Sequence, residues 1–191
     1  KEQAILDIFV DELERDDVVW DVGACLGVFS VLAGQVTTDG QVVAFEPVAA
    51  TAQRCRDNAA LNGLSNVSVC PFALGDSDGE TSIAIERDEL GTQTPALDSG
   101  GSRTITVRRG EAVVQEHPRL KPTVVKIDVE GAEGEVLRGL GPVLSEVRVV
   151  FVELHGADSQ RLERRLRDRG LDVEEFSAGG QRYLLGRCRQ S

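Results

Sequence analysis

The stretch VVWDVGACLGVFS, residues 18–30, contains the pattern that decides the fold. It begins as a Val-rich apolar run, as in a buried strand, and then places Gly23 and Gly27 before a segment with helical spacing. A strand that passes through a glycine turn into a helix is typical of a βαβ unit. Ligands of open α/β sheets bind beyond the carboxyl ends of such strands, so this turn is the first candidate for a binding site.

Similar apolar runs recur along the chain, and segments with helical periodicity separate them. We predict strands over residues 18–22, 42–46, 67–70, 124–128 and 147–153, and helices over 2–14, 28–32, 48–61, 132–144 and 159–169. Near-continuous apolar strands are typical of a parallel sheet that is covered on both faces. Residues 171–176 and 181–187, joined by glycines, predict an antiparallel hairpin at the sheet edge, and residues 91–102 predict a flexible loop.

The pattern predicts an α/β fold with an open, doubly wound, mostly parallel sheet. We expect a single domain over residues 1–191. It would consist of an N-terminal helical region (1–16), a cofactor-binding core (17–156) and a C-terminal helix and hairpin (157–191).

Composition excludes several classes of function. The chain has 21 basic and 32 acidic residues, a net charge of −11, which disfavours nucleic acid as a partner. Four cysteines and two histidines form no zinc-ligand spacing, so we predict reduced thiols, no metal and a cytoplasmic protein. No apolar run reaches the about 18 residues of a membrane span, and the start lacks a signal-peptide layout, so no membrane partner is expected. The sequence leaves the oligomeric state open.

Two acidic residues at predicted strand ends narrow the choice of ligand. Asp21 lies at the glycine turn, where it would repel a pyrophosphate and attract a cation. S-adenosylmethionine carries a sulfonium and an ammonium but no phosphate, and therefore fits this turn better than a dinucleotide. Glu46 ends the next strand, where a carboxylate can accept both hydroxyls of an adenosine ribose.

Five segments resemble the FkbM-type family of S-adenosylmethionine-dependent methyltransferases. They are DVGACLGVFSVLAG (21–34), VVAFEP (42–47), NAALNGLSNVSVCPFALGD (58–76), VVKIDVEGAEGEVLRGL (124–140) and VVFVELHG (149–156). The resemblance implies a Rossmann-like class I methyltransferase fold, with seven strands in the order 3-2-1-4-5-7-6, strand 7 antiparallel and helices on both faces. It also implies methylation of a hydroxyl on a sugar or other small molecule.

The resemblance assigns roles to particular residues. It places Asp21, Gly23 and Gly27 at the methionine end of the cofactor, Glu46 at the ribose, and the loop 72–76, with Phe72 and Ala73, at the adenine. Ala24, Cys25, Pro47 and Asp128 are further cofactor-binding residues. One difference is that Cys25-Leu26 replaces the more usual Asn-Ile, which removes a polar side chain from the cofactor loop.

The acceptor side would be formed by the ends of the fourth and fifth strands, which are neighbours in this topology. Asp128, Glu130, Glu153 and His155 would meet there, with Asp128 fixing the acceptor and His155 receiving its proton as the general base; Glu130 is the third catalytic candidate. A structural alternative is that Glu130 caps a helix beginning at Gly131 and His155 lies in a turn. A metal held by this cluster has no ligand-spacing motif to support it.

We therefore predict an O-methyltransferase that uses S-adenosylmethionine. Two alternatives are a non-catalytic module that binds a nucleoside cofactor or a partner, and a nicotinamide-dependent oxidoreductase. The latter should have a third glycine near position 28 and no acid at position 21.

Overall fold

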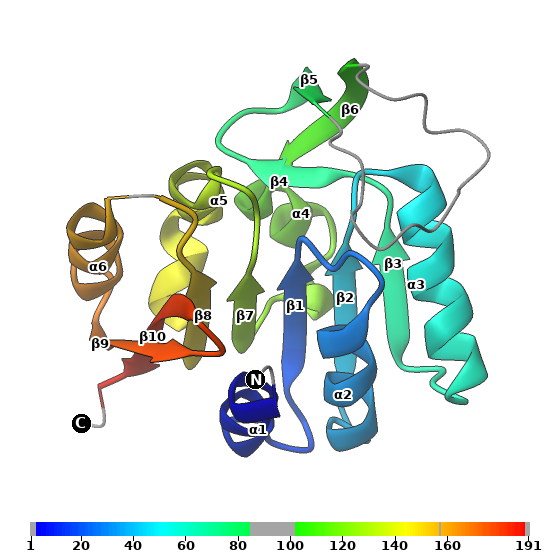
Figure 1. The fold of residues 1–191 in the computed structure, drawn as a ribbon, viewed down its shortest axis with the longest axis horizontal. Coiled ribbons are helices and arrows are strands. Elements are labelled where there is room, and N and C mark those ends of the chain that lie inside the picture. The colour runs from blue at the N-terminus through cyan, green and yellow to red at the C-terminus, as the bar shows by residue number, and fades with distance from the viewer. Residues whose placement is uncertain (1–2, 85–101, 157, 190–191) are drawn as a thin grey trace.

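The computed structural model describes residues 3–84, 102–156 and 158–189. Its main element is a seven-stranded sheet with the order β3-β2-β1-β7-β8-β10-β9 (Figure 1). The strands are β1 (Val18–Val22), β2 (Gln41–Phe45), β3 (Val67–Cys70), β7 (Val124–Ile127), β8 (Val149–Glu153), β9 (Leu171–Ala178) and β10 (Gln181–Cys188). β10 is antiparallel to both neighbours and the other pairings are parallel, so the predicted strand order and hairpin are confirmed.

Helices cover both faces of this sheet (Figure 1). They are α1 (Gln3–Asp11), α2 (Val28–Val36), α3 (Ala49–Leu61), α4 (Gly110–Glu116), α5 (Glu133–Leu140) and α6 (Ser159–Arg167), with 3-10 turns η1 (Pro118–Leu120) and η2 (Gly141–Glu146). Apolar side chains of α1 and α2 pack on one face of the sheet, whereas those of α4, α5, η2 and α6 pack on the other. The topological switch lies between β1 and β7, because the chain first moves outward to β3 and then returns past β1.

The alternation of side chains along the strands positions the polar residues of the site. Val19, Val124 and Phe151 belong to the core that faces α1 and α2. Asp21 and Lys126 have the same parity as these residues and lie nearer the carboxyl ends of β1 and β7. Asp21 and Lys126 are also register partners across the β1–β7 pair, so the fold places an acid beside a lysine.

A second, three-stranded sheet was not predicted. It contains β4 (Ala73–Gly75), β6 (Ser102–Arg109) and β5 (Gly79–Ala84) in that spatial order. The predicted loop 72–76 is therefore partly a strand, held by parallel pairing to β6 and by close packing on α5. A Cβ on Gly139 of α5 would lie 1.7 Å from the carbonyl oxygen of Gly75. Residues 91–101 of the predicted flexible loop 91–102 lie outside the described residues.

The predicted helix 132–144 is divided in the structure. α5 ends at Leu140, and Gly141, with φ +53, and the following Pro142 lead into η2. Proline at this position cannot continue the α-helical hydrogen bonds. No disulfide joins the four cysteines, all of which lie within the described residues, and only Cys55 is buried. No helix within the described residues is long and apolar enough to cross a membrane. The predicted division of the chain at residues 16 and 156 stays a prediction.

Candidate active site

The turn between β1 and α2 packs directly against the end of β7. Gly23 has φ +80, and a Cβ on it would lie 1.9 Å from the carbonyl oxygen of Asp128. Gly27, just before α2, has φ +83, and a Cβ there would lie 2.5 Å from the sulfur of Cys55. Positive φ and the lack of space both require glycine at these two positions. Ala24 lies buried in the same turn.

Glu46 follows β2 and connects two loops. Its Oε2 accepts a hydrogen bond of 3.0 Å from the backbone N–H of Cys25, and its Oε1 accepts one of 2.9 Å from that of Val48. Burial raises the pKa of Glu46 above its ordinary value, against the lowering effect of the two backbone donors. A carboxylate oxygen has two lone-pair positions, so each oxygen keeps one for a ligand hydroxyl. Cys25 is exposed, with φ +50, and Pro47 is half-buried.

Asp21 is completely buried and has partners within the protein. Its Oδ2 accepts a hydrogen bond of 2.6 Å from Ser30, and its Oδ1 lies 3.4 Å from Nζ of Lys126, an ion pair without a well-aligned hydrogen bond. The family resemblance places Asp21 along the methionine end of a cofactor. In the structure its carboxylate is not accessible to a ligand, so it would act on a bound cation through its electric field rather than by contact.

Lys126 is the main polar residue that the sequence analysis missed. Its Nζ lies between Asp21 and Asp128, 3.1 Å from Oδ2 of Asp128, and 4.4 Å from the ring centre of Phe29 on α2. Burial lowers the pKa of Lys126, but the two carboxylates raise it by more, so the net shift is upward and the side chain stays protonated. The sequence contained one signal, a lysine within the apolar run VVKI, but its position opposite Asp21 depends on the β1–β7 register.

His155 lies among four carboxylates beyond the ends of β7 and β8. Its Nε2 is 3.5 Å from Glu153, 3.7 Å from Asp128 and 3.8 Å from Glu130. Its Nδ1 is 3.1 Å from Oε1 of Glu133. The predicted meeting of the acids and the histidine at this edge of the sheet is therefore found in the structure. Burial, and then the charge of Asp128, raise the pKa of Glu153.

Two acids of this cluster differ from their expected surroundings. Glu130 does not cap a helix, because its side chain is 90% exposed and α5 begins only at Glu133. Glu133 was not among the predicted site residues, yet it is completely buried, and its Oε2 has no hydrogen-bond partner in the described structure. An acid in the first turn of a helix is usually solvated, whereas Oε1 of Glu133 contacts Nδ1 of His155 and accepts a hydrogen bond of 3.3 Å from the backbone N–H of Gly131.

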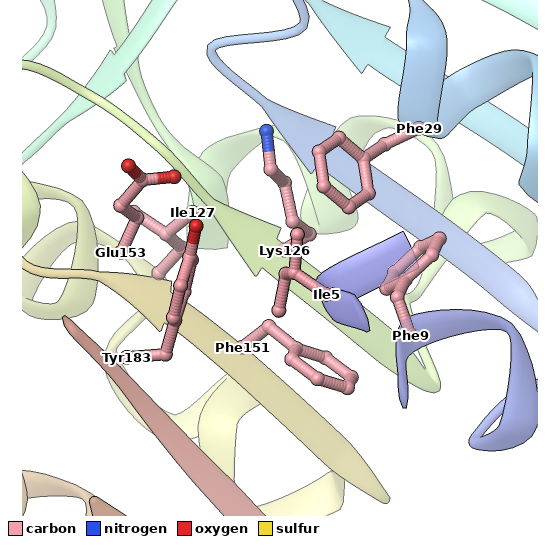
Figure 2. Close-up of a pocket in the computed structure, with 8 residues that line it drawn as sticks. All are labelled: Ile5, Phe9, Phe29, Lys126, Ile127, Phe151, Glu153 and Tyr183. Atoms are coloured by element: carbon pink, nitrogen blue, oxygen red, sulfur yellow. The ribbon is translucent and has the colours of Figure 1, made fainter. Parts of the chain in front are cut away.

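A small apolar pocket adjoins this cluster on the face covered by α1 and α2 (Figure 2). It is lined by Ile5, Phe9, Phe29, Lys126, Ile127, Phe151, Glu153 and Tyr183. In Figure 2 the polar ends of Lys126, Glu153 and Tyr183 point to the same side, away from Phe151. The hydroxyl of Tyr183 also forms a hydrogen bond with Glu153, which lowers the pKa of that acid. The pocket thus joins an aromatic wall to a charged rim.

Phe72 and Ala73 lie at the other end of the predicted site. The Phe72 ring is 5.6 Å from the Phe45 ring on one side, and the guanidinium of Arg108 lies 5.4 Å from its centre. Ala73 begins β4 and is half-buried. Phe72 thus packs against Phe45 and Arg108. The contact of Phe72 and Ala73 with an adenine stays a prediction.

Two groups of residues therefore meet at Asp128. Its backbone carbonyl lies against the glycine turn, and its carboxylate lies between Lys126 and His155. A ligand in the glycine turn would be next to a cluster that can bind a hydroxyl and accept a proton from it. Such an arrangement suits a group transfer between a bound cofactor and an oxygen nucleophile.

Comparisons with known proteins find similarity to methyltransferases. A family model described as the methyltransferase FkbM domain matches residues 21–173. The chain is 34% identical over 175 residues to the hexuronic acid methyltransferase AglP of Haloferax volcanii, covering 91% of this chain and 71% of that protein. It is 28% identical to the methyltransferase sdnD of Sordaria araneosa, covering 86% of this chain and 77% of that protein.

Solved structures support the fold alone, because their sequence identities are low. A methyltransferase FkbM from Methylobacillus flagellatus superposes with a TM-score of 0.67 at 17% identity, over 92% of this chain and 44% of that chain. This chain therefore spans less than half of that structure. A putative tRNA (m1A22) methyltransferase of Streptococcus pneumoniae, solved with S-adenosyl-L-methionine, superposes with a TM-score of 0.58 at 16% identity, over 98% of this chain and 73% of that one.

Proposed function

The chain belongs to the FkbM methyltransferase family, and on this basis we propose that it transfers a methyl group from S-adenosylmethionine to a hydroxyl oxygen of a sugar or other small molecule. The observation that carries the proposal is the contact between the glycine turn and Asp128. Asp128 contacts both the cofactor loop, through its backbone carbonyl, and His155 of the acid–histidine cluster, through its carboxylate. Membership of a methyltransferase family also argues against a nicotinamide oxidoreductase.

The cofactor would bind at the carboxyl ends of β1 and β2. In this proposal Glu46 accepts the ribose hydroxyls, while the turn with Gly23, Ala24, Cys25 and Gly27 surrounds the methionine end. Pro47, Phe72 and Ala73 would border the base. Support comes from Glu46, which is held by two backbone donors and therefore presents a fixed acceptor. The buried Asp21 would stabilise the positive charge of the cofactor through its electric field, without direct contact, and Lys126 compensates part of the charge of Asp21.

The acceptor would bind on the other side of Asp128. In the reaction a hydroxyl oxygen forms a bond to the methyl carbon, the carbon–sulfur bond breaks, and the sulfonium becomes a neutral thioether. The hydroxyl proton passes to the group formed by Asp128, Glu130 and His155. Such in-line transfer depends on alignment, exclusion of water and a nearby proton acceptor. The sugar class is supported by the hexuronic acid methyltransferase among the relatives.

The proposal is tested with methyl-labelled S-adenosylmethionine and a panel of hexuronic acids, neutral hexoses and polyols. We expect label in at least one acceptor, and calorimetric binding of S-adenosylmethionine in the micromolar range with none for NAD. Asp128→Asn and His155→Ala should lower the rate about a hundredfold while cofactor affinity stays within a few fold. His117→Ala removes the other histidine, which is exposed, and should change neither quantity.

Preferential binding of NAD would overturn the proposal. So would binding of S-adenosylmethionine without transfer to any acceptor, which would instead support the non-catalytic binding module. An unchanged rate in His155→Ala would remove His155 from the proton-accepting group.

A further inference from the structure

We infer that Asp128, Glu153 and His155 form a binding site for one divalent metal ion on the acceptor side of the site. One ligand atom from each of these three side chains lies within 4.8 Å of the other two. The inference deepens the proposed function and depends on it for the role of the ion, but not for the existence of the site. It also differs from the sequence analysis, which predicts no metal.

The two distances from His155 to the carboxylates are close to those of a loaded site. Metal–ligand bonds to His nitrogen and carboxylate oxygen are about 2.0–2.2 Å, so two ligands of one ion lie about 3.0–3.6 Å apart in octahedral or tetrahedral geometry. Nε2 of His155 is 3.5 Å from Oε1 of Glu153 and 3.7 Å from Oδ1 of Asp128. The carboxylate oxygens of Asp128 and Glu153 lie within 4.8 Å of each other, so the side chains must rotate to bring all three ligand atoms onto one ion.

Glu133 supplies an independent argument for a cation at this place. It is completely buried, and although its Oε1 accepts a hydrogen bond of 3.3 Å from the backbone N–H of Gly131, its Oε2 has no hydrogen-bond partner in the part of the chain that the structure describes. A buried carboxylate is costly unless a positive charge compensates it. Glu133 also contacts Nδ1 of His155, which leaves Nε2 to face the two other ligands. Histidines that bind metals usually donate their second N–H to such a carboxylate.

The balance of charge around the cluster favours the same conclusion. Five acids, Asp21, Asp128, Glu130, Glu133 and Glu153, are linked to one another through Lys126 and His155. Even a protonated His155 would leave five negative charges against two positive ones. Lys126 already lies between Asp21 and Asp128, so its charge is shared. A divalent ion would remove most of the remaining excess.

The ligand set indicates the kind of ion and its use. One imidazole and two carboxylates suit Mn²⁺ and neighbouring first-row ions better than Ca²⁺, which takes oxygen ligands. Three protein ligands leave coordination positions open for oxygens of the acceptor, and an ion in contact with a hydroxyl lowers the pKa of that hydroxyl. His155 would then act as a ligand, and the exposed Glu130, whose Oε1 lies 3.8 Å from Nε2 of His155, would accept the proton. An acidic sugar could enter this carboxylate-rich site because the ion would bridge the charges.

Mn²⁺ is the probe for the test, with protein first dialysed against a chelator and no cofactor or acceptor present. Electron paramagnetic resonance of free Mn²⁺ and calorimetry should give one site per chain, and the relaxation of water protons should show open coordination positions. Glu153→Gln and His155→Ala should each weaken binding at least tenfold, and Glu133→Gln should weaken it about 10–100-fold. Glu175→Gln and His117→Ala change exposed residues and should have no effect.

The absence of a stoichiometric site in the wild type would overturn the inference, and so would equal affinity in Glu153→Gln and Glu175→Gln. If His155→Ala melts much earlier than the wild type, His155→Gln and Glu153→Gln decide the outcome. Because the measurement involves neither S-adenosylmethionine nor methyl transfer, its failure would leave the proposed function intact. A failure of transfer would likewise leave the metal site in place.

Discussion

Replacing Gly23 by alanine should be the most damaging single change in the turn after β1. The residue has φ +80, and a Cβ would lie 1.9 Å from the carbonyl oxygen and 2.9 Å from the carbonyl carbon of Asp128, and 3.2 Å from Cγ1 of Val129. The two shortest contacts involve backbone atoms, which cannot rotate away as a side chain can. Either the turn or the end of β7 must therefore move.

The expected loss has two parts. A left-handed backbone conformation costs a non-glycine residue about 1–2 kcal/mol. Forcing a methyl group into filled space costs about 1–3 kcal/mol. The free energy of unfolding should therefore fall by about 2–5 kcal/mol, which corresponds to about 4–20 °C in Tm for a chain of this size.

Gly170→Ala is the matched control. Gly170 has φ +91, and a Cβ on it would meet nothing within 4 Å, so only the backbone part of the loss applies. We expect its Tm to fall by about 2–8 °C. Calorimetric melting of both variants measures the difference, and titration with S-adenosylmethionine at a temperature where both are folded should show a loss of binding in Gly23→Ala alone. Equal melting temperatures and equal binding in the two variants would refute the steric argument.

Three further predictions test the buried charges. Lys126→Met leaves Asp21 and Asp128 without their cation, so urea unfolding should show a loss of about 3–5 kcal/mol, and adding Asp21→Asn should recover part of it; no loss would mean that the lysine is not charged. Ser30→Ala removes the hydroxyl donor to Asp21 and should cost about 1.5–3 kcal/mol by the same measurement, whereas Ser68→Ala, a half-exposed contact, serves as control. Affinity for S-adenosylmethionine should fall as the pH is lowered through the raised pKa of Glu46, because a protonated acid is a poorer hydrogen-bond acceptor. Glu46→Gln should remove this pH dependence. Glu46→Ala should weaken binding by about 1.5–3 kcal/mol at neutral pH.

The large sheet could be predicted because its strands carry a strong local signal. The Val-rich runs that became β1, β2, β7 and β8 are apolar on both faces, as helices on both sides require. The strand order itself came from the family resemblance, since periodicity does not show which strands are neighbours. β5 and β6 were missed because GETSIA and SRTITVRR are rich in polar residues and lack a continuous apolar run, and because their pairing joins segments on either side of residues 85–101.

The site divides in the same way. Asp128, Glu130 and His155 could be predicted to meet, because the carboxyl ends of neighbouring parallel strands lie at one edge of the sheet. Lys126 and Glu133 could not, since each depends on a contact between elements distant in the sequence. Lys126 is opposite Asp21 only through the β1–β7 register, and the contact of Glu133 with His155 joins α5 to the residues that follow β8.

The contacts of Asp128 connect the two halves of the site, so we expect the cofactor loop and the acceptor cluster to respond together. Asp128 touches the glycine turn with its backbone and both Lys126 and His155 with its side chain. If a substitution at Gly23 displaces the end of β7, it therefore moves the Asp128 carboxylate of the acceptor cluster as well as the backbone that packs against the cofactor loop. The converse also holds, because an ion on Asp128 would restrain the carbonyl that packs on Gly23. The sequence spacing between residues 23 and 128 contains no sign of this coupling, which arises only from the pairing of β1 with β7.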